Sequence, residues 1–186
     1  MNATTSSRLR PDLIVDAAST LLEAEGKLTM RTLAQRLQVD PMAVYHYFPN
    51  KEALVQAVAS RRYGRLDAVA AGFSPEEDWQ ARTAALATAY LELACSAPVL
   101  VRTLASGAAD SGAPARHFAE AFARATEGLE LKDGRFDNAM HALVDFIHGY
   151  ALAGMPDQAQ WRGELEVLLL GIGALAGRRK DRVSAG

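Results

Sequence analysis

The sequence lacks the features on which several classes of protein depend. Its 186 residues include a single cysteine, Cys95, which excludes an internal disulfide and a cysteine-based zinc site. No apolar run reaches the roughly 18 residues of a membrane-spanning helix, and the opening stretch MNATTSSRLRP contains no hydrophobic signal segment. We therefore expect a cytoplasmic protein without a membrane segment.

Enzyme signatures are also missing. The sequence has no phosphate-cradling glycine loop, no Gly-x-Ser-x-Gly nucleophile turn and no HExxH metal pair. Its acidic residues are scattered at charge-pair spacings, which is typical of solvated helix faces. We therefore predict a protein that is not an enzyme and that holds no cofactor and no metal.

Charge is unevenly distributed along the chain. Residues 1–65 hold nine Lys or Arg and six Asp or Glu, a formal charge of +3, whereas residues 66–186 hold eleven and sixteen, a charge of −5. This modest asymmetry favours an N-terminal part that faces nucleic-acid phosphates and a larger part that does not.

Two short helices joined by a tight turn are predicted between residues 29 and 51. Thr29 is a good helix cap, and three apolar residues then recur at the spacing of one buried helix face, namely Leu33, Ala34 and Leu37. Asp40 is again a good cap, and Pro41 stands at the first helical position, where its missing N–H is harmless.

The second of these helices is predicted to bury Val44 and Phe48 and to turn its other residues outward. The outward set includes two tyrosines and a histidine, each with an apolar body and a polar tip suited to phosphates, thymine methyls and base edges. This is the pattern of a DNA-binding helix-turn-helix. The residues predicted to face the major groove are Met42, Ala43, Tyr45, His46 and Tyr47.

Residues beside this helix are predicted to set the register on the phosphates. Lys51 lies at the start of the next helix, which Asn50 caps, and a helix N-terminus holds a phosphate well. Thr29 and Arg31 would also contact phosphates, with Arg31 able to reach a base. Arg8 and Arg10 are either further DNA contacts or part of a solvated tail. An ordinary helical hairpin is the alternative interpretation of the same capping signals.

The segment from Val44 to Leu54, VYHYFPNKEAL, together with Thr29, Arg31, Leu33, Ala34 and Leu37 ahead of it, closely resembles the DNA-binding domain of the tetracycline-repressor (TetR) family. The resemblance covers roughly residues 10 to 60. Members often carry glycine where this chain has Gln38, and a positive φ there would cost glutamine about 1 kcal/mol.

The rest of the chain is predicted to be helical, because nothing in the second half alternates with the period of a strand. Gly26 ends a first helix over residues 11–25, and a long helix over residues 51–71 links the DNA-binding part to the remainder, with Arg61, Arg62 and Arg65 in solvent. Ser74 to Glu77 carries a helix start signal. The later helices are expected from there to about residue 95, from 98, from 114 to near 128, over 135–153 and over 157–177.

The last two predicted helices are apolar on nearly all sides, more than one small bundle covers. A second copy of the chain would cover them, and the resemblance supports this reading because TetR-like proteins form dimers through a four-helix interface. The alternative is that both helices are central to the single chain.

The resemblance also implies a small-molecule inducer inside the C-terminal part. His141, Asp145 and His148 lie on one side of a helix, but two turns separate the histidines, so a polar cavity wall suits them better than one metal ion. Our predicted ligand-binding residues are Phe118, Phe122, Met140, His141, Asp145 and His148. Histidines of an ordinary core or surface are the alternative.

We therefore predict an all-α protein of two domains. Residues 1–50 form a three-helix helix-turn-helix domain, and a long helix joins it to a ligand-binding and dimerisation domain over residues 51–186. The predicted function is a transcriptional repressor that binds a palindromic operator as a homodimer and is released by a small-molecule inducer. The alternative is a helical ligand-binding or interaction protein whose DNA-binding domain does not function.

Overall fold

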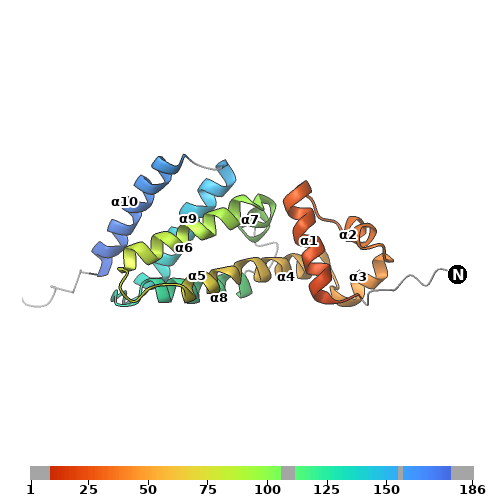
Figure 1. Ribbon diagram of the computed structural model, residues 1–186, viewed down its shortest axis with the longest axis horizontal. Coiled ribbons are helices and arrows are strands. Elements are labelled where there is room, and N and C mark those ends of the chain that lie inside the picture. The colour runs from red at the N-terminus through yellow and green to blue at the C-terminus, as the bar shows by residue number, and fades with distance from the viewer. Residues whose placement is uncertain (1–8, 106–111, 155–156, 177–186) are drawn as a thin grey trace, which may run out of the picture.

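The computed structural model describes residues 9–105, 112–154 and 157–176 of the chain. All regular structure in these ranges is helical (Figure 1), which confirms the predicted all-α fold. The helices are α1 (Pro11–Glu25), α2 (Met30–Leu37), α3 (Pro41–Tyr47), α4 (Lys51–Tyr63), α5 (Arg65–Ala71), α6 (Trp79–Cys95), α7 (Pro98–Ala105), α8 (Gly112–Ala125), α9 (Arg135–Ala153) and α10 (Gln158–Ala176).

Local capping sets the boundaries of the first three helices. Gly26 ends α1 in the left-handed conformation with φ 61°, and the Thr29 hydroxyl accepts the N–H of Thr32 at the start of α2. The Asp40 carboxylate accepts the N–H of Met42 at 2.8 Å, directly beside Pro41 at the start of α3. Gln38, between α2 and α3, has φ 56°, so the strained left-handed position expected from the sequence is present.

The N-terminal helices share one apolar core with α4. Its innermost side chains are fully buried and come from all four helices: Ile14, Leu33, Val44, Leu54 and Val58. Burying each such side chain stabilises the fold by about 1.5–3 kcal/mol. The short helices α2 and α3 are therefore held rigidly against α1 and α4.

The predicted long helix over residues 51–71 is interrupted at Gly64, which is a correction. The N–H of Gly64 still bonds to the carbonyl of Ser60 at 2.9 Å, but Asp67 bonds back only three residues, to Gly64, as in a tightened turn. A Cβ at position 64 would lie 3.2 Å from the Ser60 carbonyl and 3.7 Å from the His117 ring. Helix α8 packs against both α4 and α5 on either side of this break. The two helices together still run from the N-terminal helices into the body (Figure 1).

The start signal at Ser74 to Glu77 forms a turn and does not begin a helix, a second correction. Local side-chain bonds do form there: the Glu77 carboxylate accepts the N–H of Ser74, and the Ser74 hydroxyl accepts that of Glu76. The chain is then extended at Asp78, whose carboxylate accepts the N–H of Ala81 at 2.7 Å and caps α6. The second cap begins the helix because continuous helix-forming residues follow it.

Helix α6 lies at the centre of the C-terminal body. It packs against α5, α8 and α9, and α8 also packs against α4 and α5. Helix α10 lies on the outside, where it contacts α6 and α9 (Figure 1). Within the described ranges no single helix is both long and apolar enough to cross a membrane, and only α6 and α7 taken together, bent by 100°, meet that length and composition.

Candidate DNA-binding surface and ligand cavity

Helix α3 presents the outward face that its sequence predicts. Val44 is fully buried and anchors the helix, whereas Met42 and Tyr45 are 71% and 41% exposed. His46 is exposed and Ala43 is half-buried. Exposed apolar and aromatic side chains on this short helix do not stabilise the unbound protein. Patches of such side chains are typical of binding surfaces.

Tyr47 is also exposed, but its hydroxyl has a partner. It donates a hydrogen bond of 2.7 Å to the carbonyl of Leu9, just before α1, and its ring lies nearly perpendicular to that of His46, with centroids 5.2 Å apart. Tyr47 therefore ties the start of the described chain to α3, and it offers a ring edge and hydroxyl lone pairs to a ligand.

The predicted phosphate contacts surround α3. Thr29 and Arg31 are exposed at the start of α2, and Lys51 is exposed at the first position of α4. The Asn50 side chain accepts the N–H of Ala53 at 2.7 Å, which fixes this end of α4 beside α3. Arg10 pairs with Asp12 at 3.1 Å on the surface, and Arg8 lies outside the described residues.

A cavity of about 310 Å³ lies between α4, α6, α8 and α9. Five of the six predicted ligand-binding residues line it, namely Phe118, Met140, His141, Asp145 and His148. Phe122 does not line it: it is fully buried behind Phe118, with ring centroids 6.0 Å apart, and it packs on Phe136 at 5.2 Å. The other lining residues are Tyr63, Tyr90, Leu104, Pro114, Ala115 and Val144.

His148 and Tyr90 form the polar wall of this cavity. The Tyr90 hydroxyl lies 2.7 Å from Nε2 of His148. Burial lowers the pKa of His148, with the Asp145 carboxylate opposing part of that shift, and burial raises the pKa of Tyr90 well above its ordinary value. At neutral pH the imidazole is therefore neutral and the hydroxyl keeps its proton, and the tautomer of the imidazole decides which of the two groups donates.

Tyr63 and Tyr90 are cavity residues that the sequence did not identify as a site. Their rings meet edge to face at 5.1 Å, and burial raises the pKa of Tyr63. A tyrosine on a buried helix face needs a partner for its hydroxyl. This need is the one sequence feature that could have indicated a polar site near Tyr63 and Tyr90. Helical periodicity shows which face is buried but not which helices meet there.

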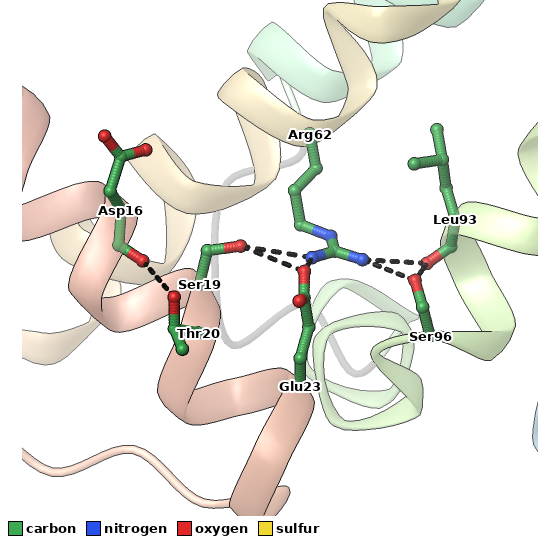
Figure 2. A network of polar contacts seen from close by, with 7 residues as sticks. All are labelled: Asp16, Ser19, Thr20, Glu23, Arg62, Leu93 and Ser96. Atoms are coloured by element: carbon green, nitrogen blue, oxygen red, sulfur yellow. Dashed lines mark hydrogen bonds and ion pairs between the residues drawn. The ribbon is translucent and has the colours of Figure 1, made fainter.

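Arg62 is buried and bridges the two parts of the molecule (Figure 2), a correction of its predicted solvent position. Only 4% of it is exposed. Its guanidinium donates to the Glu23 carboxylate and the Ser19 hydroxyl of α1, and also to the Leu93 carbonyl and the Ser96 hydroxyl at the end of α6. A planar cation with five N–H donors can satisfy all four partners from a buried position.

Helices α9 and α10 expose large apolar side chains. Leu152, Val167 and Leu170 are 44%, 70% and 64% exposed, and a Cβ on Gly163 or Gly171 would meet no other atom. Only the inner faces of these helices are buried. Because their outer apolar side chains are exposed, the alternative that both helices are enclosed within the single chain does not hold. Large exposed aliphatic side chains beside glycines leave a surface that a second helix pair can approach closely.

A larger hollow of about 840 Å³ lies between α6 and α10, but its chemistry is less specific. Alanines such as Ala81, Ala84 and Ala85 form much of its wall, and its acidic residues Asp78, Glu92 and Glu166 are exposed. The smaller cavity is the better binding site because buried aromatic rings and hydrogen-bonded polar groups converge on it. Across the described ranges, no three His, Cys, Asp or Glu side chains are placed to hold a metal ion.

Comparison with known proteins finds similarity to bacterial regulatory proteins. Residues 14–58 match the family model of bacterial regulatory proteins, tetR family. BioQ in a crystal structure with its natural double-stranded DNA operator is 26% identical, with a TM-score of 0.71, and the match covers 90% of this chain and 99% of that one. No curated protein matches the chain.

Two further solved structures have the same fold. A possible TetR family transcriptional regulator from Streptomyces coelicolor A3(2) is 28% identical, with a TM-score of 0.66 and coverage of 90% of this chain and 89% of that one. A variant of TetR from Acinetobacter baumannii AYE, in complex with minocycline, is 22% identical, with a TM-score of 0.72 and coverage of 96% and 100%. The likeness therefore extends over the N-terminal helices and the C-terminal body alike.

Proposed function

Since this chain belongs to the TetR family of transcriptional regulators, we propose that it is a repressor that binds a palindromic operator as a homodimer and is released by a small-molecule inducer. Residues 1 to about 50 would bind DNA, and residues 51–186 would bind the inducer and the second subunit. As a regulator of bacterial genes it would act in the cytoplasm, where the DNA is.

The outward face of α3 carries the DNA-binding part of the proposal. Met42, Tyr45, His46 and Tyr47 are exposed on a helix that Val44 holds in place, and with Ala43 they would face the major groove. Thr29, Arg31 and Lys51 would set the register on the phosphates. That BioQ was crystallised with its DNA operator supports the same role here.

The exposed apolar face of α9 and α10 supports the homodimer. Leu152, Val167 and Leu170 would be buried against the same residues of the partner, as a two-fold interface requires. The two α3 helices of such a dimer would reach half-sites separated by about one helical turn or a multiple of it, so the operator would be palindromic.

The cavity supports a small-molecule inducer, and α4 connects it to the DNA-binding part. Tyr63 lines the cavity, and the next residue toward the N-terminus, Arg62, holds α1 through Glu23 and α6 through Ser96. A ligand that displaces Tyr63 would shift this bridge and change the spacing of the two α3 helices. It would thereby favour the population that does not fit the operator.

Selection from a pool of random duplexes tests the proposal. The purified protein should enrich a palindrome with two equal half-sites, because each subunit presents the same helix. The Arg31→Ala protein should bind the selected duplex more weakly at the same salt concentration. Enrichment of no sequence would contradict the proposal and would instead support a ligand-binding protein whose DNA-binding domain does not function.

A further inference from the structure

We propose that the cavity between α4, α6, α8 and α9 binds a small organic cation with an attached aromatic or aliphatic group. The inference rests on the proposed function, since it gives the chemical class of the inducer. Charge, aromatic content and size each restrict what the cavity accepts.

The charge of the lining excludes an anion as the preferred ligand. Among the described residues, Asp145 is the one acidic side chain of the lining, and neither lysine nor arginine contributes to it. His148 adds no positive charge at neutral pH, because burial lowers its pKa. An anion would lose its hydration on entering the cavity and would find no opposite charge there to offset that cost. A cation would lie near the carboxylate of Asp145.

Three aromatic rings add to the attraction for a cation. Tyr63, Tyr90 and Phe118 line the cavity, with centroid distances of 5.1 Å between the tyrosines and 4.9 Å between Tyr90 and Phe118. The interplanar angles are 88° and 45°, so the rings do not stack flat on one another. The faces of such rings are negatively polarised and attract a desolvated ammonium group strongly.

The remaining lining and the volume define the rest of the ligand. Leu104, Met140 and Val144 provide an apolar wall, which suits an uncharged ring or short alkyl group. A volume of about 310 Å³ is at the lower end for ligand sites. The ligand would therefore carry one small head group and about one ring.

Titrations with three matched probes followed by ligand-observed NMR test the inference on the full-length protein. The probes are benzyltrimethylammonium, its uncharged carbon isostere neopentylbenzene, and phenylacetate as the anion. Benzyltrimethylammonium should bind at least about tenfold more tightly than the isostere, as expected for a desolvated cation on aromatic faces. Phenylacetate should bind most weakly.

Two variants on the same helix separate the cavity from the general surface charge. Asp145→Asn removes the cavity carboxylate at an exposed position of α9 and should weaken the binding of the cation several-fold while leaving the isostere unchanged. Asp137→Asn removes another exposed carboxylate of α9 that does not line the cavity, and the binding of all three probes should remain as in the wild type.

Other results would overturn the inference. Equal binding of the cation and its isostere, tightest binding of phenylacetate, binding of none of the three probes, or the same loss in Asp137→Asn as in Asp145→Asn would each contradict it. The proposed function has a separate test in operator selection. A protein that enriches a palindrome and prefers phenylacetate would remain a regulator, and only the ligand class would be wrong.

Discussion

Tyr45 and Lys51 are the single residues that test the proposed DNA-binding surface most directly. Tyr45→Ala removes an exposed ring from the middle of α3 and should weaken operator binding by about 1–3 kcal/mol. Lys51→Ala removes one phosphate contact and should reduce the salt dependence of the binding constant by about one counterion. Fluorescence anisotropy over a range of salt concentrations measures both effects.

Lys132→Ala is the matched control for Lys51→Ala. Lys132 is exposed and lies in the loop before α9, where it pairs only with Glu130 on the surface. Its removal should leave both the affinity and the salt slope unchanged. If Tyr45→Ala and Lys51→Ala bind the operator as tightly as this control, α3 and the start of α4 are not the contact surface.

Gln38 stores strain that glycine would relieve. Its φ of 56° costs an L-residue about 1–2 kcal/mol, part of which glycine loses again through its greater freedom when unfolded. Gln38→Gly should therefore raise the free energy of unfolding by about 0.5–1 kcal/mol. Urea denaturation measures this, and Gln35→Gly, at an exposed helical position of α2, should lower it instead.

His148 makes the stability depend on pH. Burial places its folded-state pKa below 6.5, so the unfolded chain binds the proton more readily. The free energy of unfolding should fall as the pH drops through 6.5 and level off below the folded-state pKa. Urea denaturation at a series of pH values should show a flatter profile for His148→Gln. A profile as steep as that of the wild type would contradict the assignment.

At the scale of helices, the side chain of Arg62 joins α4 to α1 and to the end of α6. Arg62→Met removes the donor to the Glu23 carboxylate and the Ser19 hydroxyl, and leaves Ser96 and the Leu93 carbonyl with only the bond between them. It should lower the free energy of unfolding by about 2 kcal/mol. Arg61→Met is the matched control, because Arg61 forms an exposed pair with Asp16 and should cost at most about 1 kcal/mol. Equal stability of the two variants in urea would contradict the role of Arg62.

The boundaries of helices were predictable where one residue decides them. Gly26, Asp40, Pro41 and Asn50 act through the adjacent backbone, so the sequence contains the whole cause. The start of α6 was wrong because two caps, at Ser74 and Asp78, lie close together and only the following chain decides between them. The break at Gly64 was missed because a single glycine inside a helical pattern can continue the helix as well as interrupt it.

Predicting the cavity required knowing which helices meet. The sequence identified the wall on α9, because His141, Asp145 and His148 lie on one face of a single helix. It could not show that Tyr63 and Tyr90 face them from α4 and α6, nor that Phe122 lies one layer behind Phe118. Arg62 was misplaced for the same reason, since its partners come from α1 and α6.

At the scale of the whole molecule, the outer face of α9 and α10 is the proposed dimer interface. Val167→Glu together with Leu170→Glu places two like charges at the centre of the proposed interface and should convert the dimer into a monomer. Analytical ultracentrifugation measures this. Arg124→Glu changes the charge on the exposed side of α8 and should leave the dimer intact. A double variant that sediments as the wild type would place the interface elsewhere.

The most direct test of the whole account compares the affinity for a complete palindromic operator with that for one half-site at the same salt concentration. If a dimer presents two α3 helices at a fixed spacing, the complete site should bind at least about a hundredfold more tightly than the half-site. Equal affinity for the two duplexes would contradict the account, because it would mean that a single helix-turn-helix acts alone.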